Sequence, residues 1–410
     1  MIYKSIIYYV EQLELLIKKY QRQNINRMNQ DLRNKIFFII RSVITEGFTF
    51  PNDISLSSED CETILLFSQR QSIFPLIYQG IKSINCHDYD TVLKKWETVF
   101  LKYKYNFVQK DNSLSVISNT FEKNRISYIL LKGAVVRSLY PQKWMRTSSD
   151  IDVLVHESDL ERAINVLEHN TDFKSIGNRS YHDVSLINRR IHLELHFSIK
   201  ENISNIDQIL EKTWEYAIQS VPGYRYDLTP EFQIFYTLAH INHHITNSGI
   251  GIRPFIDLWL LVNKTSFDHT ILQRILSQTS LQVFFDQSML LANSWMTNAE
   301  QSETTKMFES YCLKGGALGN REDSLLSRQR NHRKYNYIFH RVFATRELLQ
   351  EEYPELRTKP NRLFYYQIKR WKRLSKKQKR INALNEVSNV RKTKKESIEA
   401  YNDFLNRIGL

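Results

Sequence analysis

The sequence predicts an α+β protein in which a small mixed sheet is flanked by N- and C-terminal helical regions. Apolar residues follow helical spacing over most of the chain, whereas strand-like runs gather between residues 126 and 197. Only 11 glycines and 8 prolines occur among 410 residues, which excludes a loop-rich β-sandwich. The three cysteines are far apart and odd in number, so they predict no disulfide framework and favour a reducing compartment.

Residues 1–112 are expected to form the N-terminal helical region. Within it, Ser58-Glu59-Asp60 is typical of a helix start, because these side chains accept hydrogen bonds from first-turn N–H groups. The first segment contains acidic residues and lacks a small-residue cleavage site, so it predicts an amphipathic helix and not a signal peptide. The apolar clusters of this region lie at residues 13–17, 36–44 and 64–67.

Residues 113–202 are expected to form the mixed-sheet core. Strand-like runs alternate there with two segments of helical spacing, and the last two runs flank Asn188-Arg189-Arg190 as in a hairpin. This order of elements is typical of a compact α/β unit. The strands are expected at residues 128–131, 151–155, 184–187 and 191–199, and the helices at 134–140 and 158–167.

Residues 203–350 are expected to form a C-terminal helical region, and residues 351–410 a basic helical tail. The formal net charge is +13, yet 13 basic residues and one acidic residue fall within 362–395. That segment therefore carries +12 and leaves +1 for the rest of the chain. Residues 362–395 are suited to an anionic membrane surface or nucleic acid, and the alternative is a solvated basic helix.

The expected localisation is cytoplasmic, with peripheral association at a membrane as the alternative. The strongest apolar stretch, residues 254–262, is too short to span a bilayer and contains Asp257. The basic segment is then the part of the chain that would reach a membrane surface.

Two aspartates mark the strand expected at residues 151–155. Side chains of a strand alternate between its faces, so Asp150 and Asp152 point the same way. Two carboxylates placed beside an apolar face are suited to holding a hard cation such as Mg²⁺. A solvated edge strand with two surface acids is the alternative interpretation.

The strand expected at residues 191–199 carries a second polar face. His192, Glu194 and His196 share this face, while apolar side chains occupy the other. If this strand lies beside the aspartate strand, Glu194 becomes a third carboxylate in the same space. Metal binding would relieve the repulsion among three converging acids. The alternative is an amphipathic edge strand with a polar outer face.

A glycine turn follows the first expected strand. Because glycines are scarce here, Gly133 at a strand-to-helix junction is informative, and such a turn presents backbone N–H groups to a phosphate. Lys132 would add a point charge. The second part of a Walker A loop is absent, and a plain helix entry is the alternative.

Further polar residues follow helical spacing beyond the core. His240, His243 and His244 stand at i, i+3 and i+4, which allows a metal site but favours a packed or site-lining role. Arg253 and Asp257 are four residues apart and are expected to pair along one helix face.

Together these patterns resemble the nucleotidyltransferase superfamily typified by DNA polymerase beta, which has a glycine turn, an Asp-x-Asp strand and a later acidic strand. More narrowly, the chain is similar to a large bacterial family of uncharacterised nucleotidyltransferases over roughly residues 60–260. One departure is Ala134, where the superfamily usually has Gly or Ser. The resemblance is carried by Phe74-Pro75-Leu76, Leu131-Lys132-Gly133, Leu139-Tyr140-Pro141, Arg146, the residues 150–155 and 192–196, His240, His243, Arg253 and Asp257.

The resemblance implies a polymerase-beta-like core that performs a two-metal nucleotidyl transfer. Asp150 and Asp152 would ligate two Mg²⁺ ions, and Glu194 would complete the metal site or act as general base. The residues implied for phosphate binding are Lys132, Gly133 and Arg146, and those implied for the pocket are His196, His240, Arg253 and Asp257.

The expected function is Mg²⁺-dependent transfer of a nucleoside monophosphate from an NTP to an acceptor hydroxyl, with release of pyrophosphate. The acceptor is left open as a small molecule, a protein or RNA. The alternative is a catalytically silent protein of the same fold, which docks on nucleic acid or membrane through residues 362–395.

Overall fold

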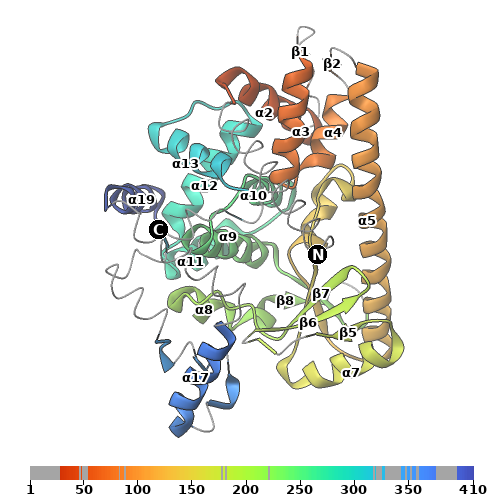
Figure 1. Ribbon diagram of the computed structural model, residues 1–410, viewed down its shortest axis with the longest axis vertical. Helices are drawn as coiled ribbons and strands as arrows, with labels where there is room; N and C mark the ends of the chain where they lie inside the picture. The colour runs from red at the N-terminus through yellow and green to blue at the C-terminus, as the bar shows by residue number, and fades with distance from the viewer. Residues whose placement is uncertain are drawn as a thin grey trace, which may run out of the picture.

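A computed structural model describes most of the chain (Figure 1). Helix α5 (Tyr89–Lys123) runs along one side, past both the N-terminal helices and a mixed sheet (Figure 1). The described residues are 28–45, 48, 54–82, 84–86, 89–176, 179–180, 182–219, 222–316, 319, 326–327, 343–346, 349–350, 353–356, 360–374 and 395–410.

The main sheet has seven strands in the described part of the chain. In chain order they are β3 (Tyr128–Leu130), β4 (Ile151–Val155), β5 (Lys174–Ser175), β6 (Asp183–Asn188), β7 (Ile191–His196), β8 (Ala217–Ile218) and β9 (Arg225–Leu228). Their spatial order is β5-β6-β7-β4-β3-β9-β8. β3 is antiparallel to β4 and parallel to β9, and β4 is parallel to β7. The mixed sheet and the β6–β7 hairpin confirm the predicted core.

The two faces of the sheet pack against different layers. Ile151, Val153 and Val155 of β4 face α5 and α7 (Leu160–Asn170) in one apolar cluster. On the other face, Leu154 joins the large core that includes the helical regions. Asp152 shares the face of Leu154, because strand side chains alternate. Its carboxylate is therefore directed toward the helical side of the sheet.

The N-terminal helical region contains α2 (Gln30–Ile44), α3 (Ser58–Arg70) and α4 (Phe74–Ile81) besides α5. The short strands β1 (Ser55–Leu56) and β2 (Asn85–Cys86) pair beside these helices. α3 begins as predicted, because Ser57 Oγ accepts from the Asp60 N–H and the Asp60 carboxylate accepts from the Ser57 N–H. The predicted stretch at residues 13–17 lies outside the described residues. Residue 112, the expected boundary with the core, falls inside α5.

After β7 the chain forms the predicted C-terminal helical region. Its helices are α8 (Ser204–Leu210), α9 (Pro230–Asn247), α10 (Arg253–Lys264), α11 (His269–Gln278), α12 (Gln282–Met296) and α13 (Glu303–Lys314). α9 and α10 each carry a proline in the first turn, where the missing N–H removes no helical hydrogen bond. The side chains of Asp268 and Ser302 cap α11 and α13.

The region expected to be helical over residues 203–350 also contains two short strands. β8 and β9 lie in this region, and β9 pairs with β3 in the register Tyr128↔Arg225. Strands of two and four residues are too short for an alternating pattern to be recognised beside longer helices. Their pairing ties the C-terminal helical region directly to the sheet.

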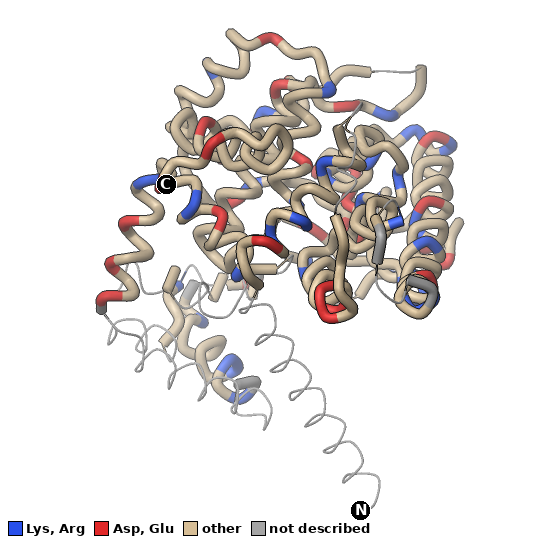
Figure 2. The backbone as a smooth tube through the Cα atoms, turned by 90° about the horizontal axis from the view of Figure 1, so that it is seen from above, with Lys and Arg blue, Asp and Glu red and all other residues tan. Residues whose placement is uncertain are grey.

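Two helices of the tail are described. α17 (Leu363–Leu374) lies apart from the main body with a small apolar cluster of Leu349, Tyr353, Leu356 and Tyr366 (Figure 1). α19 (Lys395–Ile408) returns to the large core. Figure 2 shows Lys and Arg on α17 and several acidic positions on α19. Residues 375–394 of the predicted basic segment lie outside the described residues. Within the described chain, no helix combines the length and apolarity needed to cross a bilayer.

Candidate active site

One cleft of about 520 Å³ brings together every residue that the sequence predicts for the site. It is lined by β4 and β7 on one side and by α9 and α10 on the other. A cleft of this size accommodates a small-molecule ligand. The predicted residues that line it are Lys132, Gly133, Arg146, Asp150, Asp152, Glu194, His196, His240, Arg253 and Asp257.

Asp152 and Glu194 lie side by side on neighbouring strands. β4 and β7 are parallel, and their register pairs Asp152 directly with Glu194. Asp152 is only 4% exposed. Ligand atoms of Asp152, Glu194 and His196 all lie within 4.8 Å of one another. The sequence predicted that the carboxylates of Asp152 and Glu194 would converge only if their strands were neighbours. The register of β4 and β7 meets this condition.

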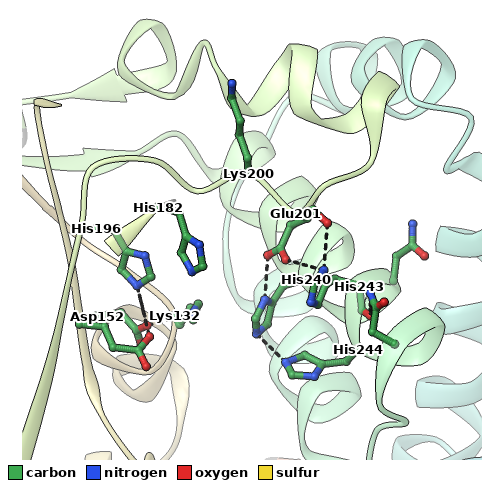
Figure 3. Close-up of polar contacts among 12 residues, drawn as sticks. Lys132, Asp152, His182, His196, Lys200, Glu201, His240, His243 and His244 are labelled. Carbon is green, nitrogen blue, oxygen red and sulfur yellow. Dashed lines mark hydrogen bonds and ion pairs between the residues drawn. The ribbon is translucent and has the colours of Figure 1, made fainter. Parts of the chain in front are cut away.

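Two side-chain nitrogens contact the buried carboxylate of Asp152. Lys132 Nζ lies 2.8 Å from Asp152 Oδ1, and His196 Nε2 lies 3.1 Å from the same oxygen (Figure 3). Burial opposes ionisation of Asp152, but Lys132 and the hydrogen bond from His196 outweigh it and hold the pKa of this carboxyl well below its usual range. The charge of Asp152 and its hydrogen bond with Lys132 in turn raise the pKa of Lys132 against the effect of burial.

The donor set of this group fits a divalent metal ion. Two carboxylates and one imidazole nitrogen converge, and carboxylate oxygen is the donor that Mg²⁺ and Mn²⁺ prefer. Asp150 lines the same cleft one residue before β4, outside that three-residue group, and accepts a 2.8 Å hydrogen bond from Ser149 Oγ. A second ion would take Asp150 as an additional ligand.

Gly133 is packed against the guanidinium of Arg146. A Cβ added to Gly133 would lie 2.5 Å from Arg146 Nη1, so the close approach requires glycine. Arg146 is not free to move, because Nη1 donates to Thr147 O at 2.9 Å and Nη2 donates to Asp257 at 2.9 Å. Lys132, immediately before this glycine, adopts a φ of 46°. The turn is thus held by both sterics and charge.

Asp257 pairs with Arg146 and not with Arg253. Asp257 accepts hydrogen bonds from Arg146 and, at 2.8 Å, from Tyr140 Oη, and all three groups are buried or nearly so. The helix pair predicted between Arg253 and Asp257 was therefore wrong. Arg253 is the first residue of α10, and its Nη1 donates instead to Thr147 O at 3.1 Å. Tertiary packing outweighed the four-residue spacing.

Arg253 brings a positive charge that the described residues do not neutralise by an ion pair. Its Nε is buried without a hydrogen-bond partner among them. Burial, together with the nearby charge of Arg146, lowers the pKa of Arg253 to about 10. Burial likewise lowers the pKa of Lys110, whose Nζ donates to Ser148 O beside the same turn. This end of the cleft is suited to an anion.

Sequence reasoning missed Glu201, which lies in the segment between β7 and α8. Its carboxylate is within 2.8 Å of His240 Nδ1 and 3.2 Å of His243 Nδ1 (Figure 3). His182 also lines the cleft, and its ring stacks on His196 with centroids 5.7 Å apart. Neither residue belongs to a periodic pattern that links it to its partners. The only sequence signal was the histidine spacing on α9.

A mixed sheet whose paired strands present two acids beside a glycine turn and buried cations is the arrangement of a nucleotidyltransferase domain. The family model for uncharacterised nucleotidyltransferases matches residues 57–297, more than half of the chain, and the protein belongs to that family. The match contains all the cleft residues named above and supports a general nucleotidyl-transfer function with an NTP substrate. No curated protein and no solved structure matches the chain.

Proposed function

We propose that the protein is a Mg²⁺-dependent nucleotidyltransferase, which moves a nucleoside monophosphate from an NTP to an acceptor hydroxyl and releases pyrophosphate. The observation that carries this proposal is the mixed charge of one cleft. It contains the paired acids Asp152 and Glu194 together with the glycine turn at Gly133 and the uncompensated guanidinium of Arg253. Such a cleft suits a metal–triphosphate complex, because the acids bind the metal and the cations bind the remaining phosphate charge.

The acids and Lys132 have distinct proposed roles. Asp150, Asp152 and Glu194 would hold two Mg²⁺ ions, which neutralise charge on the phosphates and on the leaving pyrophosphate when bound. Lys132 now contacts an oxygen of Asp152. With Asp152 holding a metal, Lys132 would be available to bind a phosphate oxygen in place of this contact. Arg146, whose charge Asp257 compensates, would keep the turn at Gly133 in shape for the phosphates.

We infer that the nucleotide lies on the α5 side of this turn. A smaller hollow of about 110 Å³ shares Gly133 with the cleft and is further lined by Tyr103, Phe107, Trp144 and Lys110. Aromatic rings stack on nucleobases, and the ammonium attracts phosphate. The hollow therefore suits part of the donor nucleotide and leaves the α9 side of the cleft for the acceptor.

Arg253→Met is expected to weaken binding of a Mg-NTP about 10- to 100-fold. The change removes a charged hydrogen-bond donor, worth about 1.5–3 kcal/mol to an anionic ligand, and keeps much of the apolar volume. Calorimetric titration of four Mg-NTP analogues that resist transfer would measure it. Arg274→Met, at an exposed position of α11, is the matched control. Equal affinities of wild type and Arg253→Met would reject the phosphate role, and no binding by wild type would reject the proposed function.

A second candidate function is docking on an anionic membrane surface or nucleic acid, without catalysis. α17 favours it, because Phe364 and Tyr365 are 70% and 58% exposed beside exposed Lys369 and Lys372. Exposed aromatic and basic side chains are typical of interfacial helices. In a co-sedimentation assay, the affinity of the protein for phosphatidylserine vesicles should then fall with added salt. It should also fall about 10-fold in Phe364→Ala. Neutral vesicles are the control, and binding to RNA alone would assign the tail to nucleic acid.

A further inference from the structure

A buried carboxylate outside the predicted metal site occupies the other wall of the cleft. Glu201 lines the cleft but is only 8% exposed. Its backbone N–H donates to Asp207 Oδ1 at 2.8 Å, and its backbone carbonyl lies 2.9 Å from His243 Nδ1. Figure 3 shows it with His240 and His243 on one side of the view, and Asp152 with His196 on the other. Glu201 is therefore held at both backbone and side chain.

His240 presents an N–H donor to the carboxylate of Glu201, and His243 presents one to its backbone carbonyl. Ser248 Oγ lies 3.2 Å from His244 Nδ1, and His244 Nε2 lies 3.0 Å from His240 Nε2. A neutral imidazole carries one N–H. If the hydrogen of His244 is on Nε2, it is donated to His240 Nε2, and the hydrogen of His240 is then on Nδ1 and points at Glu201. Burial and the charge of Lys132 lower the pKa of His240, so a neutral ring is favoured.

Glu201 remains an anion with unused hydrogen-bonding capacity. Burial would raise the pKa of Glu201, but the hydrogen bond from His240, helped by the positive charge of Lys132, outweighs it and lowers this pKa. Each carboxylate oxygen accepts two hydrogen bonds, and His240 Nδ1 takes one position on Oε1, whereas the Nδ1 of His243 bonds the Glu201 backbone carbonyl and lies 3.2 Å from Oε2. A further donor approaching from the cleft can still be accepted.

We propose that Glu201, oriented by His240 and His243, binds the acceptor hydroxyl and takes its proton as the oxygen attacks. This inference rests on the proposed nucleotidyl transfer and assigns its acceptor side. The acceptor oxygen forms a bond to the α-phosphorus, and the bond from that phosphorus to the α–β bridging oxygen breaks. The electron pair leaves with pyrophosphate, and the hydroxyl proton moves to Glu201. Glu201 is then a catalytic residue, His240 and His243 are positioning residues, and Glu194 is left to the metal.

The charges in the cleft explain why this wall suits a neutral hydroxyl. Arg253 and the turn at Gly133 supply the anion-binding groups at one end, whereas Glu201 would repel a phosphate from the other. The charge of Lys132 lowers the pKa of Glu201, and the charge of Asp152 raises that of His240. The two walls of the cleft are therefore close enough to interact electrostatically. An alcohol-bearing acceptor is thus favoured over a second anionic group.

Glu201→Gln tests this assignment because it removes the charge and keeps the shape. The probes are NTPs labelled at the α-phosphate, with Mg²⁺, and glycerol or water as the hydroxyl. We expect the variant to bind Mg-NTP analogues within twofold of wild type and to form labelled product at least about 100-fold more slowly. Glu161→Gln is the matched control, because this exposed carboxylate on α7 does not line the cleft.

The outcomes separate this inference from the function on which it rests. Wild type that fails to bind any Mg-NTP rejects the proposed function, and the role of Glu201 falls with it. Binding by both proteins with equal transfer rates rejects Glu201 alone. Binding by wild type without product from glycerol or water also rejects it, because an activating carboxylate would act on either. If Glu201→Gln misfolds and loses nucleotide binding, Glu201→Asp replaces it in the test. Aspartate keeps the negative charge but is one methylene shorter, so this variant is expected to bind the nucleotide and lose only the transfer activity.

Discussion

Asp152→Asn is expected to lower the rate of nucleotidyl transfer by at least about 10³-fold, which corresponds to about 4 kcal/mol of transition-state stabilisation. Asp152 is the most central acid of the cleft, because it contacts Lys132 and His196 and pairs with Glu194 across two strands. Asparagine has nearly the same shape but no charge. The variant therefore removes a metal ligand while it disturbs the strand little.

The measurement combines label transfer from α-labelled NTPs with titration of Mn²⁺ as a stand-in for Mg²⁺. Metal binding in the presence of nucleotide should fall together with the rate. Asp172→Asn, a substitution of an exposed acid ahead of β5, should leave both unchanged. A variant that transfers label at the wild-type rate would show that Asp152 is not a metal ligand in the reaction.

Asp257→Ala is expected to lower the free energy of unfolding by about 3–5 kcal/mol. The loss has two parts, because the substitution leaves the buried guanidinium of Arg146 without its counter-charge and Tyr140 Oη without its acceptor. Burial and the Asp257 charge also raise the pKa of Tyr140 well above its usual value, in keeping with a tight contact. Urea denaturation of wild type and variant measures the difference.

An exposed ion pair on α19 is the control against which the cost of Asp257→Ala is compared. Asp403→Ala removes the partner of Arg407 on α19 and should cost less than about 0.5 kcal/mol. The double variant Arg146→Met/Asp257→Leu should be more stable than Asp257→Ala, because it removes both charges of the buried pair and leaves neither of them without its partner. A cost for Asp257→Ala as small as that for Asp403→Ala would contradict a stabilising role for the buried pair.

The strand that carries Asp152 was predictable because its pattern is local. Alternation along five residues places Ile151, Val153 and Val155 in one apolar cluster and directs Asp152, with Leu154, to the other face of β4. The helix start at Ser58 and the β6–β7 hairpin were predictable for the same reason. Each depends on hydrogen bonds or turns within a few residues of sequence.

Glu201 could not be predicted in this way. It lies in a segment without periodicity, and its partners His240 and His243 are 39 and 42 residues further along the chain. Asp257 shows the same limit in another form. Its four-residue spacing from Arg253 predicted a helix pair, whereas its partner Arg146 is 111 residues away. Arg253, at the start of α10, donates instead to Thr147 O, a carbonyl 106 residues away in the sequence.

Periodicity and turn chemistry were therefore sufficient for the α+β class, the aspartate strand and the glycine turn, because they are properties of neighbouring residues. Which charges meet depended on the parallel register of β4 and β7 and on the packing of α9 and α10 over the sheet. Register and packing are decided by burying apolar faces that are spread over the whole chain. Only the assembled fold could set Asp152 beside Glu194, leave Arg253 uncompensated and bring Glu201 to the same cleft.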